Sequence, residues 1–159
     1  WQFLQVLMFL NILHSYMKKY TLFVKENVVL TKIMLTVRER FVKQTDVLNS
    51  KFIAILLPLD NQDDFKKQLE LIKKEFKKAK HYCYAYRVRE KSKSNDDGEP
   101  SGTAGRPLLE LLFKKNIDKV AIIVVRYFGG TKLGASRLLR TYVQAGVNVI
   151  NESELIEVG

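Results

Sequence analysis

Three carboxylates in one short segment are the first residues of this chain that could do chemistry. Asp96, Asp97 and Glu99 lie within NDDGEPSGTAGRP, residues 95–107, whose three glycines and two prolines exclude a regular helix or strand. Carboxylates at this spacing can bind a cation or act as general acid and base. A structural loop is an equally good interpretation, because such acids also cap turns and pair with arginines.

The second half of the same segment has the features of an anion site. Gly102 and Gly105 allow close backbone approach just before an expected helix start. Ser101, Thr103 and Arg106 would then surround the positive end of that helix, which attracts anions.

A second candidate anion site is RYFGGTKLGASRLLR, residues 126–140. A strand ends, two glycines turn the chain, and a helix begins among cationic side chains, a combination suited to phosphate. The candidate residues are Arg126, Gly129, Gly130, Lys132, Arg137 and Arg140. The segment is neither a Walker P-loop nor a dinucleotide fingerprint. A tight strand-to-helix connection with exposed basic residues is the alternative.

Aromatic residues alternate in HYCYAYRVR, residues 81–89, which predicts a strand. Tyr84 and Tyr86 would share one face, where they could stack single-stranded bases or simply pack against the sheet. Cys83 is the single cysteine, and we expect it to be a small buried hydrophobic residue rather than a nucleophile. One cysteine and two histidines exclude a Cys-rich or multi-His metal site, and no cofactor is expected.

Charge points to an anionic partner. The 159 residues include 27 Lys and Arg against 17 Asp and Glu, a net charge of +10. Nucleic acid, a membrane surface and an acidic protein all fit this charge, and so does a merely solvated basic face. The cysteine usage predicts a reducing, cytoplasmic location.

The first 17 residues carry no charge, and Lys18 and Lys19 follow them. Polar residues interrupt the apolar ones, so we expect an amphipathic packed or interfacial helix and no membrane anchor. Alternatively, residues 1–16 are a non-native stretch upstream of a natural start at Met17. Residues 1–48 as a whole are expected to be an N-terminal extension.

The elements that must position the candidate residues can be placed along the chain. We expect strands within 21–42, then a strand at 51–59, a helix at 60–80, the strand at 81–89, a polar loop, a helix at 107–116, a strand at 120–125 and a helix from about 133 to 149. This order predicts an α+β fold, a mixed β-sheet with helices packed on one face.

Three strings in this order, HYCYAYR, DDGEPSGTAGRP and VVRYFGGTKLGA, resemble the IMPACT/YigZ family over residues 49 to 149. The resemblance implies an N-terminal Impact domain at 49–159, with a β-α-β ribosomal-protein-type fold similar to domain IV of elongation factor G. It also implies that the ferredoxin-like second domain of YigZ-like proteins is absent. Eukaryotic members modulate translation in the pathway that activates the initiation-factor-2α kinase, and bacterial members are proposed to bind nucleic acid or ribosomes.

The sequence thus favours a non-enzymatic RNA- or ribosome-binding module involved in translation. One alternative is a small enzyme that acts on a phosphorylated or nucleotide substrate through the acidic loop. Another is a protein-interaction module that uses the apolar N-terminal segment. The sequence does not determine the oligomeric state.

Overall fold

The computed structural model describes residues 1–27 and 33–158, with side chains for 1–15 and 33–158. It divides into two units, Trp1–Lys32 and Ile33–Gly159. The first contains helix α1, Gln2–Asn27, whose side chains in residues 1–15 are solvent-exposed. The helix expected at the N-terminus is therefore confirmed, whereas its packing or interfacial role stays a prediction. Of the strands expected within 21–42, those up to Asn27 are wrong, and the part at 28–32 lies outside the described residues. Among the described helices, none has both the length and the hydropathy needed to cross a bilayer.

The second unit is built on a five-stranded sheet in the order β2-β3-β6-β4-β5. Its strands are β2 (Phe41–Val47), β3 (Ser50–Pro58), β4 (His81–Val88), β5 (Lys91–Asn95) and β6 (Val120–Tyr127). As predicted, the run VAIIVV lies in the central strand, where both faces of the sheet are covered and apolar side chains are buried on each.

The sheet is antiparallel throughout, which corrects the predicted mixed sheet. The β3-α2-β4 connection does join two strands that run in the same direction. However, β6 lies between them and pairs antiparallel with both. A β-α-β order along the chain therefore does not create a parallel pair here.

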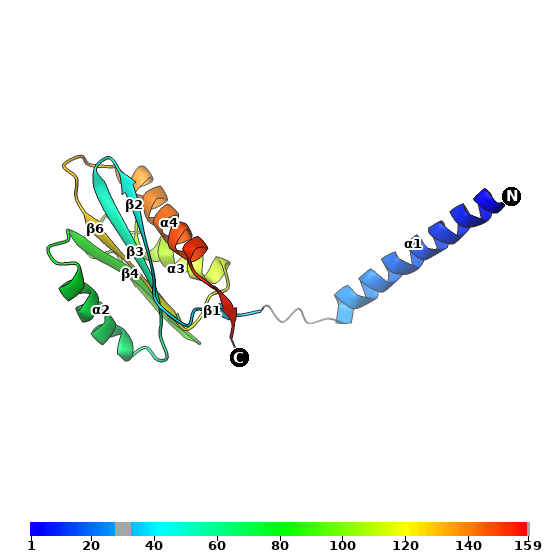
Figure 1. The fold of residues 1–159 in the computed structure, drawn as a ribbon, viewed down its shortest axis with the longest axis horizontal. Helices are drawn as coiled ribbons and strands as arrows, with labels where there is room; N and C mark the ends of the chain where they lie inside the picture. The colour runs from blue at the N-terminus through cyan, green and yellow to red at the C-terminus, as the bar shows by residue number, and fades with distance from the viewer. Residues whose placement is uncertain (28–32, 159) are drawn as a thin grey trace. The chain divides into compact units, whose positions relative to one another are not determined.

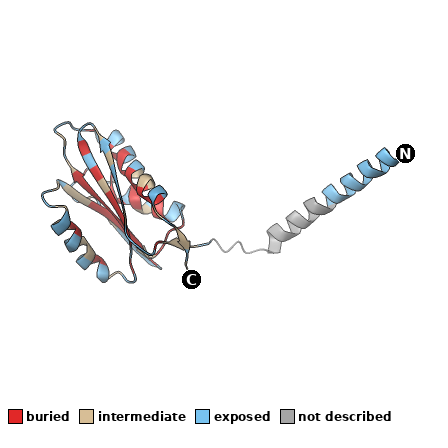
Figure 2. Cartoon of the chain, in the orientation of Figure 1, coloured by how far each residue is buried: buried red, intermediate tan, exposed pale blue. Residues whose placement is uncertain are grey.

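Helices cover both faces of the sheet, not one as predicted (Figure 1). Helix α2 (Asp64–Glu75) lies on one face, and α3 (Gly105–Lys114) and α4 (Ala135–Glu152) lie on the other. The cause is visible in β4 and β6, whose apolar residues point to both faces and must be removed from water on both. Figure 2 shows the resulting buried residues along the strands and exposed residues along the helices.

Element boundaries differ from the prediction in several places. Strand β2 extends to Val47, beyond the 21–42 in which strands were expected. Strand β5 forms the edge of the sheet within the expected polar loop; its Lys and Ser side chains gave no apolar alternation. Helix α2 is shorter than the expected 60–80 at both ends: it begins at Asp64, whose amide donates to Asn61 Oδ1 at 3.1 Å, and it ends at Glu75. A small second sheet pairs β1 (Leu35–Thr36) with β7 (Ile156–Glu157).

Candidate functional site

The two glycine-rich segments singled out in the sequence meet at one end of the sheet. The start of β4 pairs with the end of β6, so that His81 lies opposite Arg126. A pocket of about 460 Å³ opens there. Its walls come from the acidic loop (98–100), the end of β6 (126 and 128), the start of α4 (132–135 and 138) and residues 80–81.

Glu99 is the acid of this pocket, and it is already paired. Its Oε1 accepts from Arg126 Nη1 at 2.5 Å and from the Tyr142 hydroxyl at 3.0 Å. His81 Nε2 lies 3.3 Å from the same oxygen. Arg126 is buried, with its guanidinium 5.3 Å from the ring centre of Phe52. Glu99 is therefore the counter-ion of a buried arginine rather than a free acid.

Cys83 lies beneath this ion pair and is buried, as predicted. Its Sγ is 3.2 Å from the Tyr142 hydroxyl and 3.1 Å from the carbonyl oxygen of Asp96. Burial raises the pKa of the Cys83 thiol and of the Tyr142 phenol far above their usual values. Both groups therefore stay protonated, which suits hydrogen bonding and argues against a thiolate nucleophile.

The carboxylate of Asp96 accepts hydrogen bonds from the amides at the start of α3. Its oxygens accept from the amides of Gly102 at 2.9 Å, Ala104 at 3.1 Å and Gly105 at 2.8 Å. These amides are the groups that an external anion would need. A carboxylate of the chain itself therefore occupies this helix start, and binding of an external anion there stays a prediction that these bonds do not support.

The remaining candidates of the acidic segment also have local partners or lie outside the pocket. Asp97 accepts from the amide of Tyr82 at 2.7 Å. The Thr103 hydroxyl donates to the carbonyl of Pro100, and Arg106 pairs with Glu110 on the exposed face of α3. Ser101 is exposed and lies outside the pocket lining. Within the described residues, no three His, Cys, Asp or Glu side chains are grouped to hold a metal ion.

The start of α4 is open, in contrast to that of α3. Gly134 precedes the helix with φ of 75° and has no side chain of its own to cap it. Among the described residues, the side-chain hydrogen bonds around this turn are those of Arg140 with Ser136 and of Thr141 with Arg137, and neither involves the first amides of α4. Lys80 and Lys132 line the same pocket, and neither forms an ion pair within the domain at 33–158. With Arg126 they place three cations around one carboxylate, so the pocket is positive even with His81 neutral.

The two glycines before α4 set the path of its loop. The Gly129 amide donates to Ser50 Oγ at 3.1 Å, and a Cβ on Gly129 would overlap the backbone of the β2–β3 turn. Gly130 has φ of 91°, a conformation that favours glycine. In Figure 1 this loop lies beside the β2–β3 turn. Arg137 and Arg140, both predicted to bind anions, are exposed on α4 and do not line the pocket.

The predicted base-stacking tyrosines are not available to a ligand. Tyr84 and Tyr86 are each only 8% exposed, and their rings pack against Phe65 of α2 at 4.5 and 4.8 Å between centres. The exposed aromatic ring of the pocket belongs instead to Phe128, which sequence reasoning missed. Its position just after an apolar strand and before two glycines is the signal that could have indicated it.

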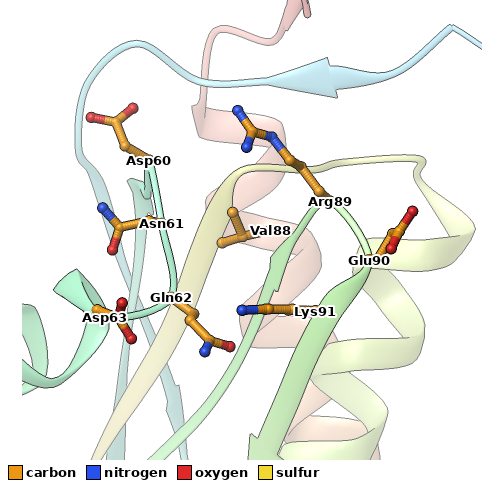
Figure 3. A pocket seen from close by; sticks show the side chains of 8 residues that line it. All are labelled: Asp60, Asn61, Gln62, Asp63, Val88, Arg89, Glu90 and Lys91. Atoms are coloured by element: carbon orange, nitrogen blue, oxygen red, sulfur yellow. The ribbon is translucent and has the colours of Figure 1, made fainter.

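A second pocket, of about 440 Å³, lies at the other end of β4 (Figure 3). It is lined by the residues before α2 and by the β4–β5 turn. Asp60, Asp63 and Glu90 face two cations, Arg89 and Lys91, so this pocket has no positive excess. Neither of the two glycine-rich segments contributes to it; from the sequence motifs it takes only Val88 and Arg89, the end of HYCYAYRVR.

Comparisons with known proteins agree with the three sequence strings. The sequence model of the Impact N-terminal domain matches residues 48–150. The IMPACT family member YvyE of Bacillus subtilis is 38% identical over 77% of this chain, and YigZ of Escherichia coli is 35% identical over 65%. These matches cover 58% and 52% of the two relatives, so the chain spans little more than half of their length. A crystal structure of a hypothetical protein aligns with a TM-score of 0.76 and 27% identity, covering 81% of this chain and 65% of that one.

Proposed function

This chain belongs to the IMPACT family, and from that premise we propose that its domain is an RNA- or ribosome-binding module involved in translation. The link to translation rests on the family resemblance. The link to RNA rests on one observation: the uncapped start of α4 opens into a pocket whose two lysines have no ion-pair partner in the described domain.

The electrostatics of the pocket support phosphate as the bound group. Free amides at a helix start carry roughly half a positive charge. Lys80 and Lys132 add two full charges, while Glu99 is engaged by Arg126 and does not oppose them. A phosphate at this position would meet oriented donors and cations without displacing a group of the protein itself.

The enzymatic alternative gains no such support. Asp96 caps α3, Asp97 holds the start of β4, and Glu99 neutralises a buried arginine. Each carboxylate thus has a structural partner, and catalysis by the acidic loop stays a prediction. The protein-interaction alternative likewise stays a prediction, as do the cytoplasmic location and the absence of a cofactor.

The test is binding of the full chain to tRNA, a single-stranded RNA and salt-washed ribosomes across a salt series. The variant Lys80→Ala/Lys132→Ala removes two cations that would contact phosphates. On single strands it should reduce the slope of log K against log salt by about 1.4, at roughly 0.7 per contact.

The matched control is Lys114→Ala/Lys115→Ala at the end of α3, which removes the same charge outside the pocket. Long-range electrostatics predict a smaller loss of affinity for this control. Equal losses from the two variants would mean that the basic surface binds without a defined site. No salt-dependent binding to any of the three ligands would contradict the proposed function.

A further inference from the structure

The Phe128 side chain is unusually exposed to solvent for an aromatic residue of this domain. Among the aromatic side chains of residues 33–158, Phe113 and Phe128 are the two classed as exposed, at 45% and 47%. The ring of Phe113 is covered by the guanidinium of Arg87, 4.5 Å from its centre. Phe128 instead lines the positive pocket.

The backbone on both sides of Phe128 is tied down. Tyr127 is paired with Lys51 in the sheet, and its hydroxyl donates to the carbonyl of Lys77 at 3.0 Å. On the other side, Gly129 is bonded to Ser50 and leaves no room for a Cβ. The ring therefore projects from backbone that is already fixed. Little conformational entropy of this segment is lost when the ring contacts a ligand.

The surroundings of the ring match the two parts of a nucleotide. Lys80, Lys132 and the start of α4 provide donors and positive charge for phosphate oxygens. The Phe128 ring provides an apolar face, and the Arg126 guanidinium lies 5.8 Å from its centre. At about 460 Å³ the pocket is within the usual range of small-ligand sites, roughly 300 to 1,000 Å³.

We propose that Phe128 stacks on an unpaired nucleobase while the pocket cations hold the adjoining phosphates, so that the site takes single-stranded RNA. This inference rests on the proposed function and specifies its ligand. In a duplex each base is stacked and paired, so a projecting phenyl ring has no base face to meet. An acidic peptide would use the lysines and not need the ring.

The experiment compares three probes of equal length by fluorescence anisotropy with the full chain. They are a single-stranded RNA, the same backbone without bases, and a duplex of the same strand. Stacking on one base predicts that the single strand binds about tenfold more tightly than the abasic strand. Phe128→Leu should remove this advantage, Phe128→Tyr should retain most of it, and Phe113→Leu should leave it unchanged.

A second measurement does not depend on Phe128→Leu being well folded. In the full chain carrying Trp1→Phe and Phe128→Trp, the new indole reports stacking directly. Saturating single-stranded RNA should quench its fluorescence, and the abasic strand at equal saturation should not. Equal quenching by both, or by neither, would overturn the inference.

The outcomes separate this inference from the proposed function. Equal affinity for all three probes, lost in Lys80→Ala/Lys132→Ala, would leave a phosphate site and overturn base stacking. Preference for the duplex would also overturn it. Binding of none of the three probes would overturn this inference, and the proposed function would be contradicted as well only if tRNA and ribosomes also fail to bind.

Discussion

Helices α3 and α4 both begin after a glycine-rich loop, yet only α4 leaves its first amides open. At α3 the carboxylate of Asp96 bonds three amides. At α4 no described side chain takes that place, and the pocket lies in front of the helix. A helix start is therefore available to an external anion only where the chain does not supply an anion of its own.

The same contrast extends to the charges around each loop. In the closed loop at 96–105, Glu99 and Asp96 are both bonded inside the domain. Along the open loop at 126–135, Lys132 has no such partner among the described residues. Substitution of Asp96 or Glu99 should therefore affect folding, and substitution of Lys132 should affect binding.

The largest loss in the free energy of unfolding is expected from Glu99→Ala. It leaves the buried guanidinium of Arg126 without its counter-ion, and such losses cost about 3 to 5 kcal/mol. Urea unfolding followed by circular dichroism measures the change. The control Glu110→Ala breaks an exposed pair with Arg106 and should change the free energy of unfolding little. A loss below about 1 kcal/mol for Glu99→Ala would contradict the structural role of Glu99.

Much of the fold follows from local patterns in the sequence. The run at 120–125 identified the central strand because it is apolar on both faces, and the helix expected at 107–116 is present as α3, Gly105–Lys114. Pairing direction could not be predicted, because it depends on β6 inserting between β3 and β4, which joins residues far apart in the chain. Helices on both faces, by contrast, were already implied by the apolar residues on both faces of β6, and the one-sided prediction overlooked this.

The candidate site was predicted in part, and the errors have one cause. Residue types identified both loops, and the structure brings them together at one pocket. However, the sequence does not reveal whether a side chain is already satisfied. Asp96 and Tyr86 have the chemistry of ligand-binding residues, but Asp96 bonds the start of α3 and Tyr86 packs under α2. Phe128 was missed because its exposure depends on the contacts of Gly129.

A smaller loss in the free energy of unfolding, about 2 to 3 kcal/mol, is expected from Asp96→Ala. Three amides of the α3 start lose their acceptor, and a lost cap alone costs about 0.5 to 2 kcal/mol. The vacated site should now resemble that of α4, so inorganic phosphate should raise the melting temperature of the variant more than that of the wild type.

The control for this variant is Asp63→Ala. Asp63 precedes α2 but makes no side-chain capping bond within the described domain, so neither stability nor phosphate response should change much. If Asp96→Ala is as stable as the wild type, the bonds from Asp96 to the start of α3 do not stabilise the fold, which contradicts the proposed difference between the two helix starts.

The buried thiol beneath the closed loop predicts a pH dependence. Burial raises the pKa of Cys83 above its unfolded value of about 8.5, so only the unfolded state loses this proton as the pH rises. Stability contributed by the group is complete below pH 8.5 and should fall by about 1 kcal/mol between pH 8.5 and 9.5. Urea unfolding at several pH values should show this fall, and Cys83→Ala should flatten it. An equal slope in both proteins would assign the fall to other groups.

The smallest effect on stability is expected from Lys132→Ala, and here the absence of an effect is informative. Lys132 is exposed, and such substitutions usually change the free energy of unfolding by less than about 0.5 kcal/mol. RNA affinity should nevertheless fall and lose part of its salt dependence. Arg137→Ala removes an equal charge from α4 outside the pocket and should weaken binding less. At an open helix start, replacing Lys132 should lower RNA affinity and leave the free energy of unfolding almost unchanged. A large loss of stability in Lys132→Ala would mean that the open loop is as important for folding as the closed one.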